Sequence, residues 1–190
     1  MRRKVSRLII FVVLITLTIT NIAYAQSIEH VQSIAHAQST IKLQAPYGPK
    51  VEDLKGKEDI IKNFQDIKRI RANLSVININ ASLTPEELRA IDKDLEYYIQ
   101  QFNSIKRNLE NHEITYKDSF ADVFFAEQIS FVAESFIISL RQQQNLVRAL
   151  EDNRAEAKKL FHSTYLIPVY YYLTLGDQMI AYIDTYFVVS

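Results

Sequence analysis

Apolar residues recur at helical spacing along most of the chain from residue 57 onward. A first helix is predicted over about 57–75 because apolar residues recur there at gaps of four, three and seven residues, at Ile60, Phe64, Ile67 and Leu74. The next segment, 76–80, reads VININ. Its β-branched residues and Asn weaken helix propensity, so the pattern leaves this segment unassigned.

A second helix is predicted to begin at the sequence Thr84-Pro85-Glu86-Glu87. Thr84 suits the N-cap, Pro85 the first helical position, and Glu87 the acceptor end of a capping box. Two registers of residues seven apart then form a continuous a/d seam: Leu88, Leu95, Phe102 and Leu109, with Ile91, Tyr98, Ile105 and His112. Such a seam needs a helical partner, and packing within a bundle is favoured over a dimeric coiled coil.

A third helix is predicted over about 117–151, with two apolar stripes side by side. One stripe contains Phe124, Phe131 and Ile138; the other contains Phe125, Ile129, Val132, Phe136 and Leu140. An apolar face this wide indicates a helix that contacts two or three neighbours.

A fourth helix is expected from about Arg154, capped by Asp152 or Asn153, and Pro168 should kink or end it. Gly176 is expected to act as a C-terminal cap, and Asp177 to begin a last helix. The predicted fold class is therefore an all-α, up-and-down bundle of about four long helices, with the last helix broken near Pro168 and Gly176.

The first 25 residues have the pattern of a secretory signal peptide. Four basic residues precede 12 residues, 8–19, that are apolar except for Thr16 and Thr18, and Ala23-Tyr24-Ala25 provides small residues for cleavage. The six-residue unit AQSIEH, VQSIAH, AQSTIK follows. The predicted domains are a signal peptide at 1–25, a flexible repeat-bearing segment and linker at 26–50, and a helical-bundle domain at 51–190. The expected location is secreted, periplasmic or otherwise extracytoplasmic.

Composition and charge narrow the function classes. With three Gly, four Pro and no Cys, the chain lacks the turns of a β-sandwich, the clustered glycines of a phosphate loop and the ligands of a Cys-based zinc site. Removing the four basic residues of the signal peptide leaves 18 basic and 22 acidic residues, a net charge of −4. A mildly acidic protein gives no electrostatic case for nucleic acid or anionic lipid.

No catalytic, metal or cofactor site can be assembled from the sequence. His112-Glu113-Ile114-Thr115-Tyr116 starts like the zinc-protease pattern H-E-x-x-H, but Tyr116 replaces the second His, so a His at the end of the seam is the better interpretation. No E-x-x-H pair is present, and His30 and His36 make a poor helical pair. A repeat of charges seven apart favours a solvated or interhelical charged stripe: Glu127, Glu134, Arg141 and Arg148.

Tyrosines gather in the C-terminal third of the chain. This region holds six of them: Tyr165, Tyr170, Tyr171, Tyr172, Tyr182 and Tyr186. Tyrosines suit interfaces and ligand pockets, but they also suit a core in which their hydroxyls find partners. Because Tyr170–Tyr172 are consecutive, they point three ways on a helix, and at least one should be exposed.

The sequence favours a non-catalytic, exported bundle that binds a protein or small-molecule partner through the Tyr-rich segment. No cofactor is expected. The alternative is a membrane-active, toxin-like bundle that inserts the segment 160–189, although His162, Asp177 and Asp184 oppose deep insertion. The oligomeric state stays open, as does an enzyme whose site has no recognisable motif.

Overall fold

The computed structural model describes residues 48–74 and 79–188. A short 3-10 turn, η1 (Val51–Asp53), precedes four long helices: α2 (Lys57–Asn73), α3 (Pro85–Thr115), α4 (Phe120–Asp152) and α6 (Ile167–Val188). A short helix, α5 (Arg154–Leu160), and a π-helical segment, η2 (Phe161–Leu166), connect α4 to α6. The predicted signal peptide and the six-residue repeat, with His30 and His36, lie outside the described residues.

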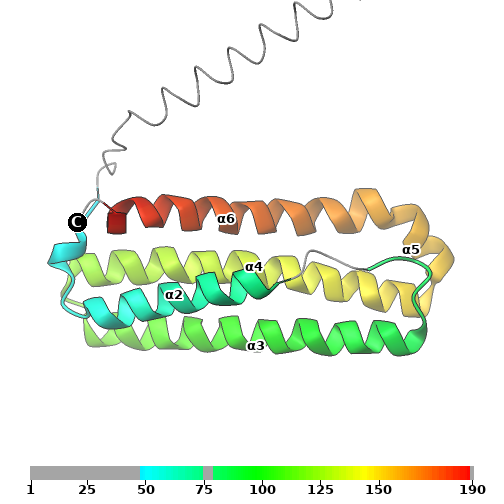
Figure 1. Ribbon diagram of the computed structural model, residues 1–190, viewed down its shortest axis with the longest axis horizontal. Coiled ribbons are helices and arrows are strands. Elements are labelled where there is room, and N and C mark those ends of the chain that lie inside the picture. The colour runs from blue at the N-terminus through cyan, green and yellow to red at the C-terminus, as the bar shows by residue number, and fades with distance from the viewer. Residues whose placement is uncertain (1–47, 75–78, 189–190) are drawn as a thin grey trace, which may run out of the picture. The chain divides into compact units, whose positions relative to one another are not determined.

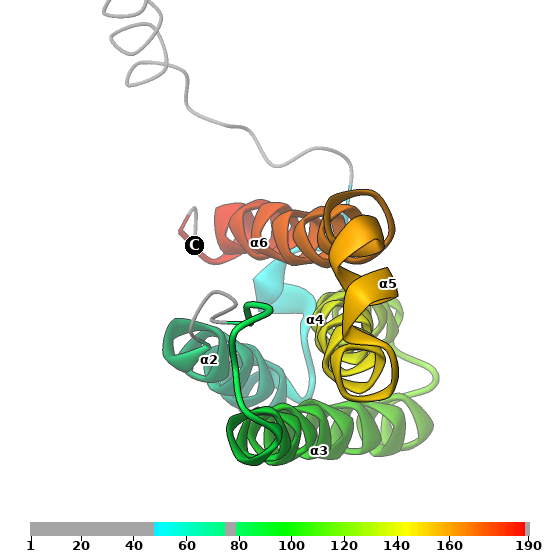
Figure 2. The ribbon, with the colours of Figure 1, turned by 90° about the vertical axis from the view of Figure 1, so that its right-hand side faces the viewer.

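The four long helices run alternately up and down, as the sequence predicts (Figure 1). Seen from the end, α4 packs against both α3 and α6, while α2 closes the other side of the bundle (Figure 2). α2 is the shortest of the four and covers about half the length of the bundle in Figure 1. α4 is therefore the central helix, which explains its wide apolar face.

α3 begins and packs as its sequence predicts. Thr84 is its N-cap, and its side chain accepts a hydrogen bond from the Glu87 N–H while the Glu87 carboxylate accepts one from the Thr84 N–H. The seam faces the core of the same chain: its buried members are Leu88, Leu95, Phe102, Ile105, Leu109 and His112, with Ile91 and Tyr98 half-buried. The bundle itself thus provides the helical partner that the seam requires.

Only one of the two apolar stripes predicted on α4 forms the core. The second stripe, Phe125, Ile129, Val132, Phe136 and Leu140, is fully or almost fully buried. In the first stripe Phe124 and Ile138 are half-buried and Phe131 is exposed. This first stripe lies at the edge of the surface that α4 buries, because its neighbours α3, α2 and α6 cover only part of α4.

The predicted C-terminal cap at Gly176 is wrong, because α6 continues through it from Ile167 to Val188. A Cβ at Gly176 would lie 2.6 Å from the ring of Phe136, so the glycine permits a close approach of α6 to α4. The irregularity expected near Pro168 is present just before it, as the π-helical segment η2. There the Ser139 hydroxyl donates a hydrogen bond of 2.9 Å to the Val169 carbonyl and fixes the start of α6 to α4.

Candidate functional site: the outward face of α6

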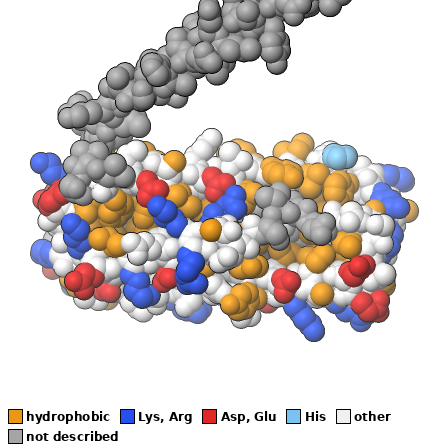
Figure 3. Space-filling view, viewed as in Figure 1, with side chains coloured by type: hydrophobic (Ala, Val, Ile, Leu, Met, Phe, Trp, Pro, Cys, Tyr) orange, Lys and Arg blue, Asp and Glu red, His pale blue; other side chains and the backbone are white. Residues whose placement is uncertain are grey.

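The fully exposed residues on the outward side of α6 include none that is charged, and its two acids, Asp177 and Asp184, are only partly exposed. Between residues 167 and 187 the exposed side chains are those we call the α6 face: Ile167, Tyr170, Tyr171, Thr174, Gln178 and Ala181. The exposed positions of α2, α3 and α4, by contrast, each include acidic and basic residues. Figure 3 shows hydrophobic side chains gathered over the first half of α6. This helix therefore differs from the other three in what it presents to solvent.

Three large apolar side chains make up much of the exposed surface of the α6 face. Ile167 is 65% exposed, Tyr170 46% and Tyr171 62%. An open hollow lies along them, lined also by His162, Ser163, Leu166, Thr174, Leu175 and Gln178. Single exposed apolar residues are common on proteins, whereas large contiguous apolar patches are typical of interaction surfaces.

The acidic residues of α6 are directed toward α2 instead. The guanidinium of Arg71 donates two hydrogen bonds to the Asp177 carboxylate, at 2.7 and 2.8 Å. The Lys68 ammonium donates to both oxygens of Asp184, at 2.8 and 2.9 Å. Since Asp177 and Asp184 are seven residues apart, both lie on the same side of the helix. These ion pairs hold α6 against α2 along one edge of the α6 face, since Asp177 lies about 20° from Tyr170 around the helix at 100° per residue.

The six tyrosines singled out from the sequence do not form one surface. Tyr170 and Tyr171 lie on the α6 face, and the half-buried Tyr172 ring contacts Tyr171 edge-on, with centroids 5.1 Å apart. Tyr165 is half-buried and packs against the core. The expectation that at least one of Tyr170–Tyr172 is exposed is thus met.

Tyr182 and Tyr186 belong to an aromatic cluster at the other end of α6. Tyr186 is 6% exposed, and its ring meets Phe125 edge-on at 5.3 Å. The two tyrosine hydroxyls lie 2.6 Å apart in a hydrogen bond. Burial, together with the bond to the Tyr182 hydroxyl, raises the pKa of Tyr186 to about 12. Tyr186 therefore serves packing, and about 22 Å of helix separates it from Tyr171 at 1.5 Å per residue.

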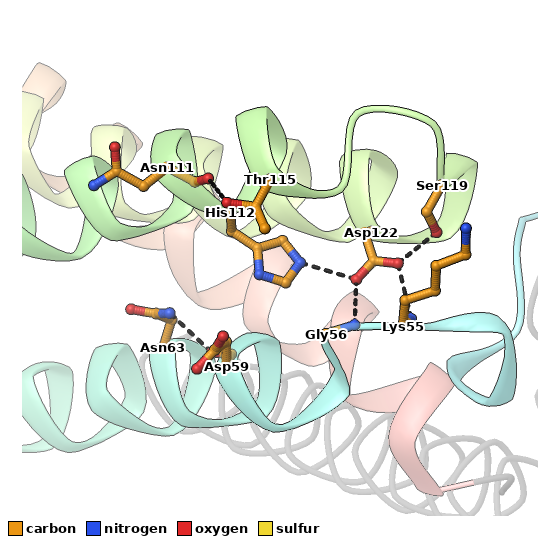
Figure 4. A network of polar contacts seen from close by, with 9 residues as sticks. All are labelled: Lys55, Gly56, Asp59, Asn63, Asn111, His112, Thr115, Ser119 and Asp122. Atoms are coloured by element: carbon orange, nitrogen blue, oxygen red, sulfur yellow. Dashed lines mark hydrogen bonds and ion pairs between the residues drawn. The ribbon is translucent and has the colours of Figure 1, made fainter.

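A second cluster of polar side chains lies at the α3–α4 turn, and Figure 4 shows it from close by. The buried Asp122 carboxylate accepts hydrogen bonds from the backbone N–H groups of Lys55 (2.9 Å) and Gly56 (2.8 Å), from the Ser119 hydroxyl and from His112 Nε2 (2.9 Å). Burial opposes its ionisation, but these four donors together hold the pKa of Asp122 below its usual value.

The Asp122 cluster has the geometry of a structural clamp. The Ser119 hydroxyl donates to Asp122 and not to His112, so the His has no nucleophile to activate, as a Ser–His pair in acyl transfer requires. Both His112 and Asp122 side chains are buried. Gly56 lies so close to the rings of His112 and Tyr116 that a Cβ there would overlap them. The cluster ties the start of α2 to the α3–α4 turn.

The other charged residues noted in the sequence do not come together as a site in the structure. In the charged repeat of α4, Glu127, Arg141 and Arg148 are exposed, while Glu134 pairs with Lys106 of α3. Glu113, next to His112, has a raised pKa because of partial burial and the nearby Glu127 and Glu110 carboxylates. Within 48–74 and 79–188, no three His, Cys, Asp or Glu side chains are grouped as metal ligands would be.

Across the part of the chain that the structure describes, one helix is long and apolar enough to cross a membrane, and it is α4. Its most apolar stretch is 56% buried inside the bundle, and the central helix of a bundle meets the same criteria of length and composition. The feature carries little weight as evidence of a membrane span.

Comparison of the chain with protein-family models, with curated proteins and with solved structures gave no significant match. Sequence reasoning found Tyr170 and Tyr171 but missed Ile167, Thr174, Gln178 and Ala181. The available signal was the recurrence of uncharged residues at helical spacing, at Ile167, Tyr170, Thr174, Gln178 and Ala181.

Proposed function

We propose that this protein is an exported helical-bundle binding protein without catalytic activity, which holds a protein partner through the α6 face. The observation that carries the proposal is the absence of charge among the exposed residues of α6, in contrast to those of α2, α3 and α4. Interface cores are depleted in charged residues and enriched in aromatic ones, and Tyr is a frequent anchor.

The shape of the site favours a protein over a small molecule as the partner. Small-ligand sites are concave and bury most of the ligand surface. The residues that line the hollow here all come from one continuous stretch, 162–178, so it is an open depression along one side of the chain with no second wall from another helix. A partner helix or another extended protein surface could cover such a stripe, whereas a small molecule on it would stay largely in water.

Export is part of this proposal and rests on the sequence of residues 1–25. The chain also has no Cys, so no disulfide is needed for the bundle to persist in an oxidising compartment.

The experiment is capture of partners from the extracytoplasmic fraction of the producing cell, followed by mass spectrometry. The double variant Tyr170→Ala, Tyr171→Ala should lose the captured partner by at least tenfold, because both anchors of the face are removed. Tyr97→Ala is the matched control, since Tyr97 is an equally exposed tyrosine on α3. All variants should keep wild-type helicity by circular dichroism. Undiminished capture by the double variant would exclude the α6 face as the contact surface.

A further inference from the structure

Five residues of the α6 face are spaced symmetrically along the helix. Thr174 stands at its centre, with Ile167 and Ala181 seven residues away on either side. Tyr170 and Gln178 lie four residues away on either side. All five are exposed and fall within about 80° of helix circumference at 100° per residue. The stripe therefore reads with the same spacing in both directions along the helix.

Side-chain size, however, is distributed unevenly along the stripe. The first half presents large side chains, Ile167 and Tyr170 with Tyr171 beside them; the second half presents Thr174, Gln178 and Ala181. If a second α6 lies antiparallel with the two-fold axis at Thr174, each Ile167 faces an Ala181 and each Tyr170 faces a Gln178. At these two pairs of positions large residues meet smaller ones, which favours packing without voids or overlap. At the axis Thr174 meets its own copy, and Tyr171 is level with Asp177, whose carboxylate is paired with Arg71.

From this complementarity we propose that the α6 face binds a second copy of this chain, as an antiparallel pair of α6 helices centred on Thr174. The inference rests on the proposed function and names its partner. Charge agrees with it, because self-pairing brings each surface against itself and like charges would then meet. None of the six residues of the α6 face is charged, and the two acids at its edge, Asp177 and Asp184, are already paired with Arg71 and Lys68 of the same chain.

The expected dimer is weak. The stripe from Ile167 to Ala181 is about 21 Å long at 1.5 Å per residue, so a single helix pair falls at the small end of specific interfaces. A test should therefore trap the pair and report its geometry. The absence of Cys from the chain makes single-cysteine variants well suited to this purpose.

Three exposed positions test the register in protein purified from cells that express the full chain, oxidised with copper phenanthroline. Thr174→Cys should form a disulfide-linked dimer, because the two copies of residue 174 meet at the axis. Ala181→Cys alone should not, because its two copies would be about 21 Å apart along the pair. A mixture of Ile167→Cys and Ala181→Cys should form the mixed dimer. Ser104→Cys, exposed on α3, measures random collision.

The expected yield of the Thr174→Cys dimer is at least fivefold above that of Ser104→Cys. A yield equal to the Ser104→Cys background overturns the self-pairing, and efficient self-linkage of Ala181→Cys overturns the antiparallel register, because a parallel pair would link every position. The proposed function fails separately: if no copy of the chain pairs but capture of another protein still depends on Tyr170 and Tyr171, the α6 face is a binding surface with a different occupant.

Discussion

At the scale of single residues, Asp122 shows how a buried carboxylate can hold a bundle together. Four donors surround it, and two of them are backbone N–H groups at the start of α2, at Lys55 and Gly56. A buried carboxylate is costly unless its oxygens are satisfied. Here the cost is offset by groups from two regions far apart in sequence, so the charge fixes where α2 begins against the α3–α4 turn.

Replacing Asp122 with Asn should lower the free energy of unfolding at neutral pH by roughly 3 kcal/mol. The NH₂ group of Asn would then face N–H or O–H groups that now donate to the carboxylate, and they could not bond to it. The folded pKa of Asp122 is lowered, so its contribution is fully present above the unfolded value of about 3.9 and is lost as the pH falls through the folded pKa. The difference between wild type and variant should therefore shrink below about pH 4, as measured by urea unfolding at several pH values.

Asp66→Asn is the control for this experiment. Asp66 pairs with Lys62 and Arg69 on the surface of α2, where such pairs contribute about 0–1 kcal/mol. Equal unfolding free energies for Asp122→Asn and Asp66→Asn would show that the clamp does not stabilise the fold.

At the scale of the helix, the main feature of α6 is its close approach to α4 at Gly176. Gly176 is buried, and the closest atoms to a Cβ placed there belong to the ring of Phe136, at 2.6 and 2.7 Å. Phe136 is itself fully buried, so a shift of its ring would disturb the core around it. The glycine that looks like a helix terminator in the sequence is therefore a contact point between two helices.

Gly176→Ala tests this role. In an exposed helix the change stabilises by about 1 kcal/mol, whereas overpacking a core costs roughly 1–3 kcal/mol. We expect a loss of stability, measured by thermal or urea unfolding. Repeating the change in a Phe136→Leu background, where the ring is absent, should reduce the loss substantially. A more stable Gly176→Ala protein would mean that α6 can shift without cost.

At the scale of the whole molecule, the membrane-active alternative requires the C-terminal third to leave the bundle. The segment 160–189 could insert only by breaking the Arg71–Asp177 and Lys68–Asp184 pairs and by uncovering the core beneath α6. Two carboxylates would then enter hydrocarbon, which is costly. We therefore expect the bundle to stay closed at a bilayer surface.

Leakage of dye from phosphatidylcholine vesicles at pH 7 and pH 5 measures this directly. We expect release no greater than that from vesicles alone. The variant Asp177→Asn, Asp184→Asn removes both ion pairs and both charges, and it shows whether they are the barrier. Release by the wild-type protein at either pH would favour the membrane-active function over the α6-face binding function.

Much of the fold follows from local patterns. The cap at Thr84, the seven-residue seam of α3 and the limits of α2 are set by interactions within a few residues, and the structure agrees with each prediction. These features depend on helix geometry alone, in which a residue's neighbours three, four and seven positions away are known in advance.

The sequence by itself determined that the chain is helical, where most helices start, and that no cysteine supports the fold. Only the tertiary structure decided that Gly176 contacts Phe136 and that Asp177 and Asp184 turn to α2. It also decided that Tyr186 belongs to the core and that Tyr182 packs against it. The reason is that each of these depends on which helix lies opposite. Helical periodicity shows which residues share a face, but the partner that covers the face, or leaves it open as on α6, is set by packing between segments distant in the chain.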